Sequence, residues 1–144
     1  MMTIRNNVFS KISSAGYALY NYNHAFANSD FNNLYTANCT SLYYSQFPTA
    51  GVQTTLQAIR NMNTELNSIV HDPGFTSSTN LQPDATNPAS WSLQGRGEHA
   101  SFNTTDINGN TRVTTKGAGV PDIGAYEFTP SVLPPDATAI PAAR

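Results

Sequence analysis

The sequence predicts an all-β fold in which short strands stack as the coils of a solenoid. A pattern of two asparagines followed by two apolar or aromatic residues occurs at residues 6–9 and again at 32–35, and the spacing of 26 residues is about one solenoid coil. Near the end of the chain, Asn108-Gly109 is a hairpin signal, and the apolar segment 121–128 is the expected returning strand. With 144 residues, the chain is long enough for one domain with a modest core.

The other elements follow from local patterns. We expect strands at 4–9, 17–20 and 29–35, where apolar and aromatic residues are bounded by Gly and Asn. Apolar residues at 56, 59 and 62, after a threonine that can serve as a cap, predict a short amphipathic helix near residues 54–62. A further strand is expected over 68–75, and asparagines at the bends can form ladders of side-chain amides along the stack.

Charged residues in the C-terminal hairpin predict a cap that is held together by ion pairs. The Asn108-Gly109 turn is expected to place both of its central residues at positive φ. Asp106, Arg112, Asp122 and Glu127 should then lie close enough for one or two ion pairs. A bidentate contact from Arg112 to the carboxylate of Asp122 or Asp106 would fix the cap, and truncating Arg112 would cost about 1 to 3 kcal/mol.

Several of these segments match motifs that occur together in one family. Residues 106–112 follow D-x-D/N-G-x-x-R, residues 122–128 follow D-I-G-A-x-E-[FY], and N-N-L-Y, T-L-Q-A-I and S-I-V-H-D-P-G-F precede them in the same order. The chain therefore resembles the last coils and cap of bacterial extracellular right-handed parallel β-helix proteins, of the pectate-lyase-like, choice-of-anchor type. Segment 87–95 departs from the family pattern, because Trp91 and Ser92 stand where Ile and Asp are usual.

The resemblance covers about residues 3–128 and implies a particular architecture. It implies a short right-handed parallel β-helix of two to three coils, with one short covering helix and a C-terminal hairpin cap. It also implies a location outside the cell or at the cell surface. We accordingly divide the chain into coils and cap at 1–128 and a proline-rich tail or linker at 129–144.

Composition excludes several functions. The net charge is −2 and the seven cationic residues are scattered, which argues against a nucleic-acid partner. No apolar run is long enough to span a membrane. Histidine spacing offers no zinc site, and the calcium-loop-like start at Asp106 has Gly117 where a bidentate acid is needed, so we expect no metal and no cofactor. Asn38 and Asn103 match the N-glycosylation pattern.

Catalysis is less expected than a non-catalytic role. Relatives with this scaffold include polysaccharide lyases and glycosidases, which need a base together with a cation, or a pair of carboxylates. The coils form no recognisable pair of this kind, and we assign no catalytic residue. The charged residues available in the coils are Arg5, Lys11, Asp30, Arg60, Glu65 and Asp72.

Tyrosines supply the only candidate ligand site, because an outward ring can stack on a sugar while an inward ring lines the core. Tyr20, Tyr22, Tyr43 and Tyr44 are the candidate glycan-binding residues.

Three functional hypotheses follow from these observations. The first is a non-catalytic extracellular structural or surface module, self-associating or stacked on an upstream β-helix domain, and possibly the subunit of a head-to-tail fibre in which residues 129–144 pack on a neighbour. The second is the C-terminal fragment of a polysaccharide lyase or glycoside hydrolase. The third is a glycan-binding module with a polysaccharide partner.

Overall fold

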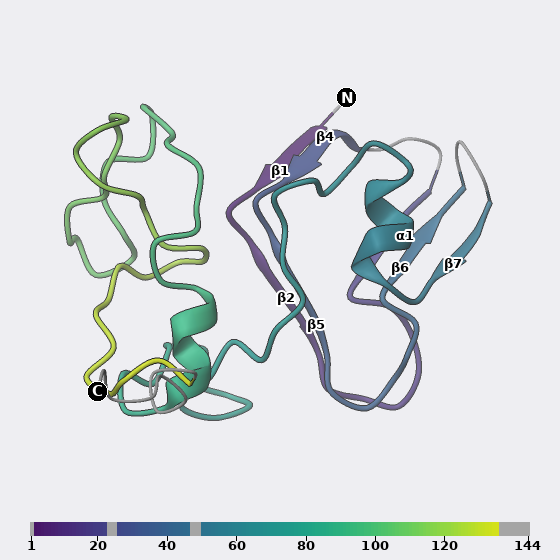
Figure 1. Cartoon of the computed structure of the whole chain (residues 1–144), viewed down its shortest axis with the longest axis horizontal. Helices are drawn as coiled ribbons and strands as arrows, with labels where there is room; N and C mark the ends of the chain where they lie inside the picture. The colour runs from purple at the N-terminus through teal and green to yellow at the C-terminus, as the bar shows by residue number, and fades with distance from the viewer. Residues whose placement is uncertain (1, 23–25, 47–49, 136–144) are drawn as a thin grey trace, which may run out of the picture.

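The structure, a computed structural model, describes residues 2–22, 26–46 and 50–135. Its regular structure is mostly β, with one α-helix and one 3₁₀-helix (Figure 1). The predicted all-β class is therefore confirmed at this level. The strands lie in the first 53 residues, and the chain beyond residue 70 consists mainly of turns and extended segments.

Three pairs of parallel strands organise the N-terminal region. β1 (Met2–Arg5) pairs with β4 (Phe26–Asp30), β2 (Val8–Lys11) with β5 (Asn33–Thr36), and β3 (Leu19–Asn21) with β6 (Tyr43–Ser45). Val8 lies opposite Asn33 and Leu19 opposite Tyr43, so partners are 25 and 24 residues apart. The predicted spacing of 26 residues was therefore one or two residues too long.

The bends between these strands explain that difference. Asn6 and Phe31 occupy equivalent bends with φ values of 59° and 56°, and the Asn6 N–H donates to the Phe31 carbonyl at 3.1 Å. Asn32 therefore lies opposite Asn7, whose backbone N–H donates to Asn32 Oδ1 at 3.0 Å. Each of the long strands predicted at 4–9 and 29–35 is consequently two strands separated by a bend.

One step of the predicted ladder of asparagine side-chain amides is present at this bend, and a serine extends it. The Asn7 side-chain amide donates to Asn32 Oδ1 at 3.3 Å, and the Asn32 backbone N–H donates to Ser68 Oγ at 2.8 Å. Ile69 adds a parallel bridge to Asn33, which continues the stack by one residue pair. The strand predicted over 68–75 is thus reduced to isolated bridges at Ile69 and Phe75, because Pro73 and Gly74 turn the chain away.

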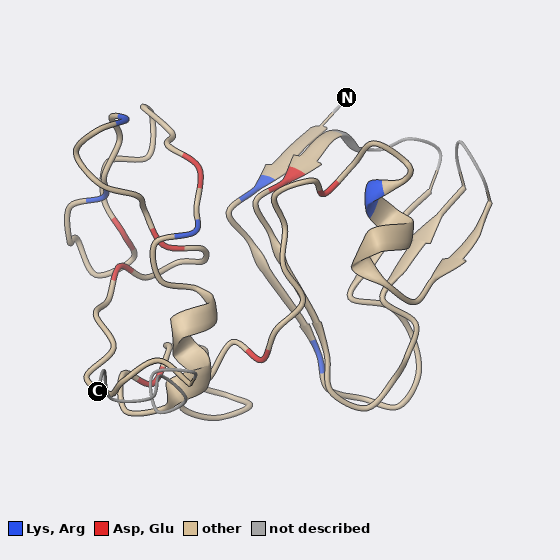
Figure 2. Ribbon diagram, viewed as in Figure 1, with Lys and Arg blue, Asp and Glu red and all other residues tan. Residues whose placement is uncertain are grey.

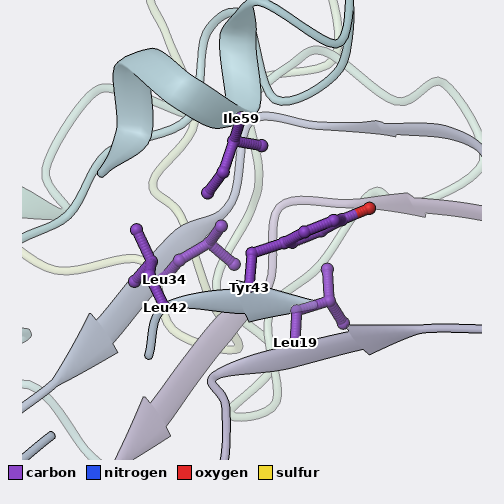
Figure 3. Close-up of a cluster of buried hydrophobic side chains, with 5 residues drawn as sticks. All are labelled: Leu19, Leu34, Leu42, Tyr43 and Ile59. Carbon is purple, nitrogen blue, oxygen red and sulfur yellow. The ribbon is translucent and has the colours of Figure 1, made fainter. Parts of the chain in front are cut away.

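The last strand of the third sheet is antiparallel to its neighbour. β7 (Gly51–Gln53) pairs antiparallel with β6, and α1 (Leu56–Arg60) follows it directly. The helix predicted near 54–62 is thus confirmed, although it is shorter than predicted. Figure 3 shows Ile59 of α1 pointing toward Tyr43 and the leucines of the core. The buried core is formed by Leu19, Leu34, Leu42, Tyr43 and Ile59.

Thr55 caps α1, as the sequence predicted. Its side-chain oxygen accepts the Ala58 backbone N–H at 3.2 Å. Replacing Thr55 by alanine is expected to lower the free energy of unfolding by about 1 kcal/mol, because one N–H of the first turn loses its partner. Urea unfolding of T55A beside T54A, which alters a threonine outside the cap, would measure the effect. Equal stabilities of the two variants would show that the cap contributes nothing.

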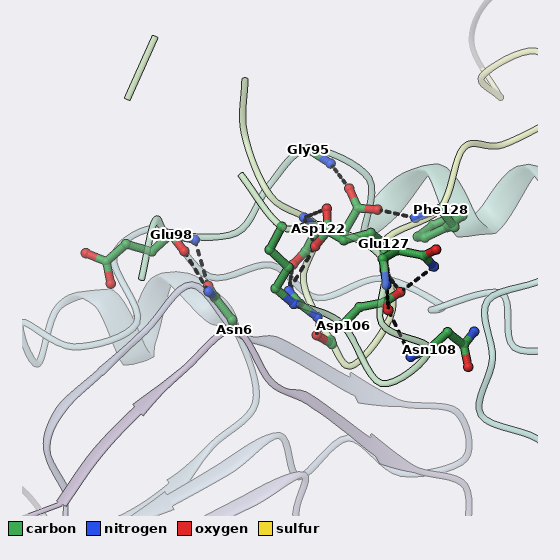
Figure 4. A network of polar contacts seen from close by, with 11 residues as sticks. Asn6, Gly95, Glu98, Asp106, Asn108, Asp122, Glu127 and Phe128 are labelled. Carbon is green, nitrogen blue, oxygen red and sulfur yellow. Dashed lines mark hydrogen bonds and ion pairs between the residues drawn. The ribbon is translucent and has the colours of Figure 1, made fainter. Parts of the chain in front are cut away.

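The C-terminal region is attached to the strands by two asparagine side chains. Asn6 Nδ2 donates to the Glu98 carbonyl at 2.7 Å, and the Glu98 N–H donates back to Asn6 Oδ1 at 2.7 Å (Figure 4). Asn33 makes the same pair of bonds with the His71 backbone, at 3.0 and 3.1 Å. We call these pairs the asparagine clamps. In each clamp the side-chain amide donates to the carbonyl and accepts from the N–H of the same residue, as the backbone of a neighbouring strand would.

The first part of the predicted tail packs on its own chain. The Ser131 N–H donates to the Ala85 carbonyl at 2.7 Å, and Trp91 Nε1 donates to the Val132 carbonyl at 2.8 Å. Trp91 belongs to the 3₁₀-helix Pro88–Ser92, which occupies the segment that departs from the family motif. The remainder of the tail, 136–144, lies outside the described residues. Among the described residues, no helix has the length and apolar character needed to cross a membrane.

Candidate binding site and terminal polar network

A group of four tyrosines gathers on the sheet formed by β3, β6 and β7. The Tyr20 and Tyr44 ring centroids are 4.7 Å apart with planes inclined by 13°, and the Tyr20 and Tyr22 centroids are 6.0 Å apart with planes inclined by 10°. Tyr17 lies tilted beside both Tyr20 and Tyr44, at 5.6 and 5.7 Å. We call Tyr17, Tyr20, Tyr22 and Tyr44 the tyrosine cluster.

The strand register creates this cluster. Tyr20 lies opposite Tyr44 in the β3–β6 pair, so the two side chains leave the same face of the sheet. Tyr22 follows Tyr20 by two residues and therefore points in the same direction. Tyr20 and Tyr22 are each about half exposed, at 50% and 49%.

One predicted tyrosine belongs to the core instead. Tyr43 is 1% exposed, and its hydroxyl accepts a hydrogen bond from Asn21 Nδ2 at 3.0 Å. It cannot contact a glycan at the surface, so its assignment as a binding residue was wrong. Tyr17, which the sequence did not single out, takes its place in the cluster.

The surroundings of the cluster are neutral. β3, β6 and β7 contain no charged residue, and β6 and β7 are uncoloured in Figure 2. Burial, followed by the neighbouring hydroxyls of Tyr44, Tyr22 and Tyr17, raises the pKa of Tyr20, so its hydroxyl stays protonated at neutral pH. Within the described part of the chain, the hydroxyls of Tyr20, Tyr22 and Tyr44 make no hydrogen bond. They are available to a ligand.

The predicted cap is built around Asp106 rather than around a long hairpin. Its carboxylate accepts the backbone N–H groups of Asn108 and Asn110, each at 2.8 Å, and that of Glu127 at 2.9 Å (Figure 4). Burial favours the neutral acid, but these bonds and one from the Asn110 side chain outweigh it and lower the pKa of Asp106 to about 2. The Asp106 carboxylate is therefore ionised at neutral pH and holds the turn in place through these hydrogen bonds.

The turn itself differs from the prediction. Only Gly109 has positive φ, at 82°, while Asn108 does not. The Gly109 N–H donates to the Asp106 carbonyl at 3.1 Å, which moves the tight turn one residue earlier, to Ile107 and Asn108. Segment 121–128 forms no strand, although Ala125 accepts the Ile107 N–H at 3.0 Å.

Arg112 is buried in this network and forms one of the predicted ion pairs of the cap, with Glu127 rather than with Asp122 or Asp106. Its Nη1 lies 2.9 Å from Glu127 Oε1, and its Nη2 donates to the Gly124 carbonyl at 2.6 Å. The expected bidentate contact with the carboxylate of Asp122 or Asp106 is absent from the described contacts. Asp122 offers Arg112 only its backbone carbonyl, at 3.4 Å.

The carboxylate of Asp122 has another role. It accepts the backbone N–H groups of Gly95 at 2.6 Å and Phe128 at 2.9 Å, which ties the segment around Gly95 to the segment 122–128 (Figure 4). Burial raises the pKa of Asp122, and burial followed by the charge of Asp122 raises that of Glu127. The four predicted residues thus form one network, although with partners that sequence could not assign.

Another buried carboxylate, that of Glu65, lies outside this network and was not selected from sequence as a site. Glu65 is completely buried at the inner side of the bend, where Ser29 Oγ, Ser68 Oγ and Asn32 Nδ2 donate to its two oxygens. Burial raises the pKa of Glu65, and the three side-chain bonds oppose that shift only in part. No cation faces this carboxylate in the described contacts, so it acts as a structural acceptor.

A groove of about 1180 Å³ separates the strands from the C-terminal region. Thr3, Arg5 and Asn28 line one wall, and Phe102, which is 91% exposed, lies on the other. An ion pair between Arg5 and Glu98 crosses it. The groove contains no group of metal ligands, and none was found among the described residues.

The remaining sequence candidates lie at the surface. Asn38 and Asn103 are both exposed, and the Asn38 side-chain amide donates to the Ile12 carbonyl at 2.6 Å. A glycan on Asn38 would have to displace that bond. Cys39 is a free, partly buried thiol near the carbonyls of Gly16 and Ser41.

Comparisons with known proteins gave no match: no family model, no curated protein and no solved structure is significantly similar to this chain.

Proposed function

We propose that the chain forms a short right-handed parallel β-helix and acts as a non-catalytic structural module outside the cell that self-associates through its first coil. The observation that carries the proposal is the repeated parallel register, in which three strands at 2–21 stack on three at 26–45 with offsets of 24 or 25 residues. Parallel crossovers of this kind are right-handed in almost all proteins. The polar ladder from Asn7 to Ser68 supports a third, partial coil.

The charged residues of the coils favour a structural role over catalysis. Asp30 accepts the backbone and side-chain N–H groups of Asn67 at 2.6 and 2.7 Å, and Arg60 donates to the Ser68 carbonyl at 2.9 Å. Glu65 is inaccessible to a substrate. These groups hold bends and loops, and a lyase or glycosidase would need them free in a groove.

The first coil has an unpaired edge in the described part of the chain. We define it as the side of β1, β2 and β3 that faces away from β4, β5 and β6. The Asn33 N–H points toward the preceding coil, where it donates to the Asn7 carbonyl at 2.8 Å. Val8 lies opposite Asn33, so its N–H points the same way, toward a side with no described strand. Ser10, two residues on, presents its N–H in that direction as well.

Such an edge accepts strands from other chains. The fibre hypothesis additionally placed the tail on a neighbouring subunit. Ser131 and Val132 instead bind Ala85 and Trp91 of the same chain, so the proposed contact rests on the first-coil edge. Two copies joined edge to edge give a closed dimer, whereas an edge joined to the opposite end of the next copy gives a growing fibre.

Replacing Ser10 by proline tests this contact. Proline removes the outward N–H and is tolerated on edge strands, whereas S10A keeps the N–H and serves as the matched control. Sedimentation of the full chain is expected to show an oligomer that S10P abolishes and S10A retains, with similar thermal stability in both. The particle mass distinguishes a dimer from a fibre. A full chain that stays monomeric at high concentration would contradict self-association, and turnover of pectin or alginate by the purified chain would contradict the non-catalytic role.

A further inference from the structure

The tyrosine cluster has features that the structural role does not require. Three near-parallel rings stand on one sheet, with Tyr20 and Tyr22 half exposed. Val52 lies opposite Tyr44 in the β6–β7 pair and is 44% exposed, so it extends the same apolar face. An interior position would protect such rings from water, yet the core of the coil is filled by Tyr43 and aliphatic side chains instead.

The chemistry of this face selects a ligand with both apolar and polar surface. Aromatic rings pack against flat apolar surfaces, and tyrosine adds a hydroxyl that donates and accepts hydrogen bonds. A pyranose ring has such a surface, with C–H groups on its faces and hydroxyls around its rim. The Tyr20, Tyr22 and Tyr44 hydroxyls are without partners in the described residues and can bond to that rim.

The charge of the face narrows the ligand class further. Polyuronates and nucleic acids need cations at their binding sites, and β3, β6 and β7 supply none. A neutral ligand carries no charge that this face would have to compensate. The match is therefore to an uncharged glycan rather than to an acidic one.

We propose that the tyrosine cluster is a binding site for a neutral polysaccharide. The pyranose rings of the ligand stack on the rings of Tyr20 and Tyr22, next to the ring of Tyr44. The site uses tyrosine side chains on the outer face of the sheet, whereas the self-association proposed above uses backbone N–H groups of β2. Although β3 belongs to the first-coil edge, the two proposals depend on different groups, so S10P and Y20A test them separately.

Calorimetric titration of the full chain with cellohexaose, xylohexaose and hexagalacturonate tests the site. Binding is expected for at least one of the two neutral probes and not for hexagalacturonate. Y20A is expected to weaken that binding at least about tenfold, since truncating an aromatic residue at the centre of a contact commonly has an effect of this size. Y20F keeps the ring and should retain most of the affinity.

The matched control is Phe102→Ala, which removes an exposed aromatic ring far from the cluster in sequence. F102A should bind like the unmodified chain. Circular dichroism of Y20A and Y20F would verify that both variants remain folded, and Y22A provides a second variant should Y20A fail to fold. Binding of neither neutral probe, preference for hexagalacturonate, unchanged affinity in folded Y20A, or an equal loss in F102A would each overturn the proposal.

Discussion

Arg112→Ala is expected to lower the free energy of unfolding by about 3 kcal/mol. Its guanidinium is nearly inaccessible, and it holds the Glu127 carboxylate and the carbonyls of Asp122 and Gly124. Removing one partner from a buried pair leaves the other charge unpaired, which costs more than the pair itself contributes. Chemical denaturation of R112A at neutral pH measures the change.

Two further variants decide whether the buried pair is the cause. Lys116→Ala removes a cation from an exposed position in the same region and should change stability by less than about 0.5 kcal/mol. Adding Glu127→Gln to Arg112→Ala neutralises the orphaned acid and should recover part of the loss. If R112A were as stable as K116A, the guanidinium would be acting only as a surface charge.

Replacing Glu65 by alanine should be about as damaging, at about 3 kcal/mol. The variant removes the acceptor for Ser29, Asn32 and Ser68 and leaves a void at a fully buried bend. Glu98→Ala is the matched control, because Glu98 lies at a partly exposed ion pair and its clamp bonds come from the backbone. Equal losses in both variants would argue against a special role for the buried carboxylate.

Glutamine at position 65 should have a pH-dependent effect. Burial raises the folded-state pKa of Glu65 above its unfolded value, so folding favours the protonated acid. The resulting stability is complete below the unfolded pKa and is lost as the pH rises through the folded pKa. E65Q does not titrate at this position, so its melting temperature should improve relative to the unmodified chain between pH 4 and pH 8. A constant difference over that range would show that the carboxylate titrates normally.

Local patterns predicted the helix and the repeat of paired asparagines, because both depend on residues close in sequence. Thr55 and Ile59 lie within one stretch of amphipathic periodicity. The paired asparagines revealed the repeat, but the bends inside segments 4–9 and 29–35 were not placed, and the register was misjudged by one residue. A repeated residue type does not reveal which copy takes positive φ, and here Asn6 is equivalent to Phe31.

Burial of the tyrosines could not be predicted in the same way. Tyr43 and Tyr44 are adjacent and chemically identical, and alternation along a strand leaves either one free to face the core. The partners of Arg112 and Asp122 could not be predicted either, since all except the Glu127 carboxylate are backbone groups of segments without regular structure. The turn lies one residue earlier than predicted because the Asp106 carboxylate accepts the Asn108 N–H. The Asn-Gly pair alone does not indicate this hydrogen bond.

The asparagine clamps also affect the order in which parts of the structure can form. The Asn6 clamp joins residues separated by 92 positions, whereas the β1–β4 and β2–β5 partners are 24 or 25 positions apart. During synthesis the strands can pair as soon as the second set has emerged, but the side-chain amide of Asn6 must wait for Glu98. Asn6 is therefore made long before its clamp partner, and until Glu98 has emerged the corner of the first coil is solvated and open to other chains.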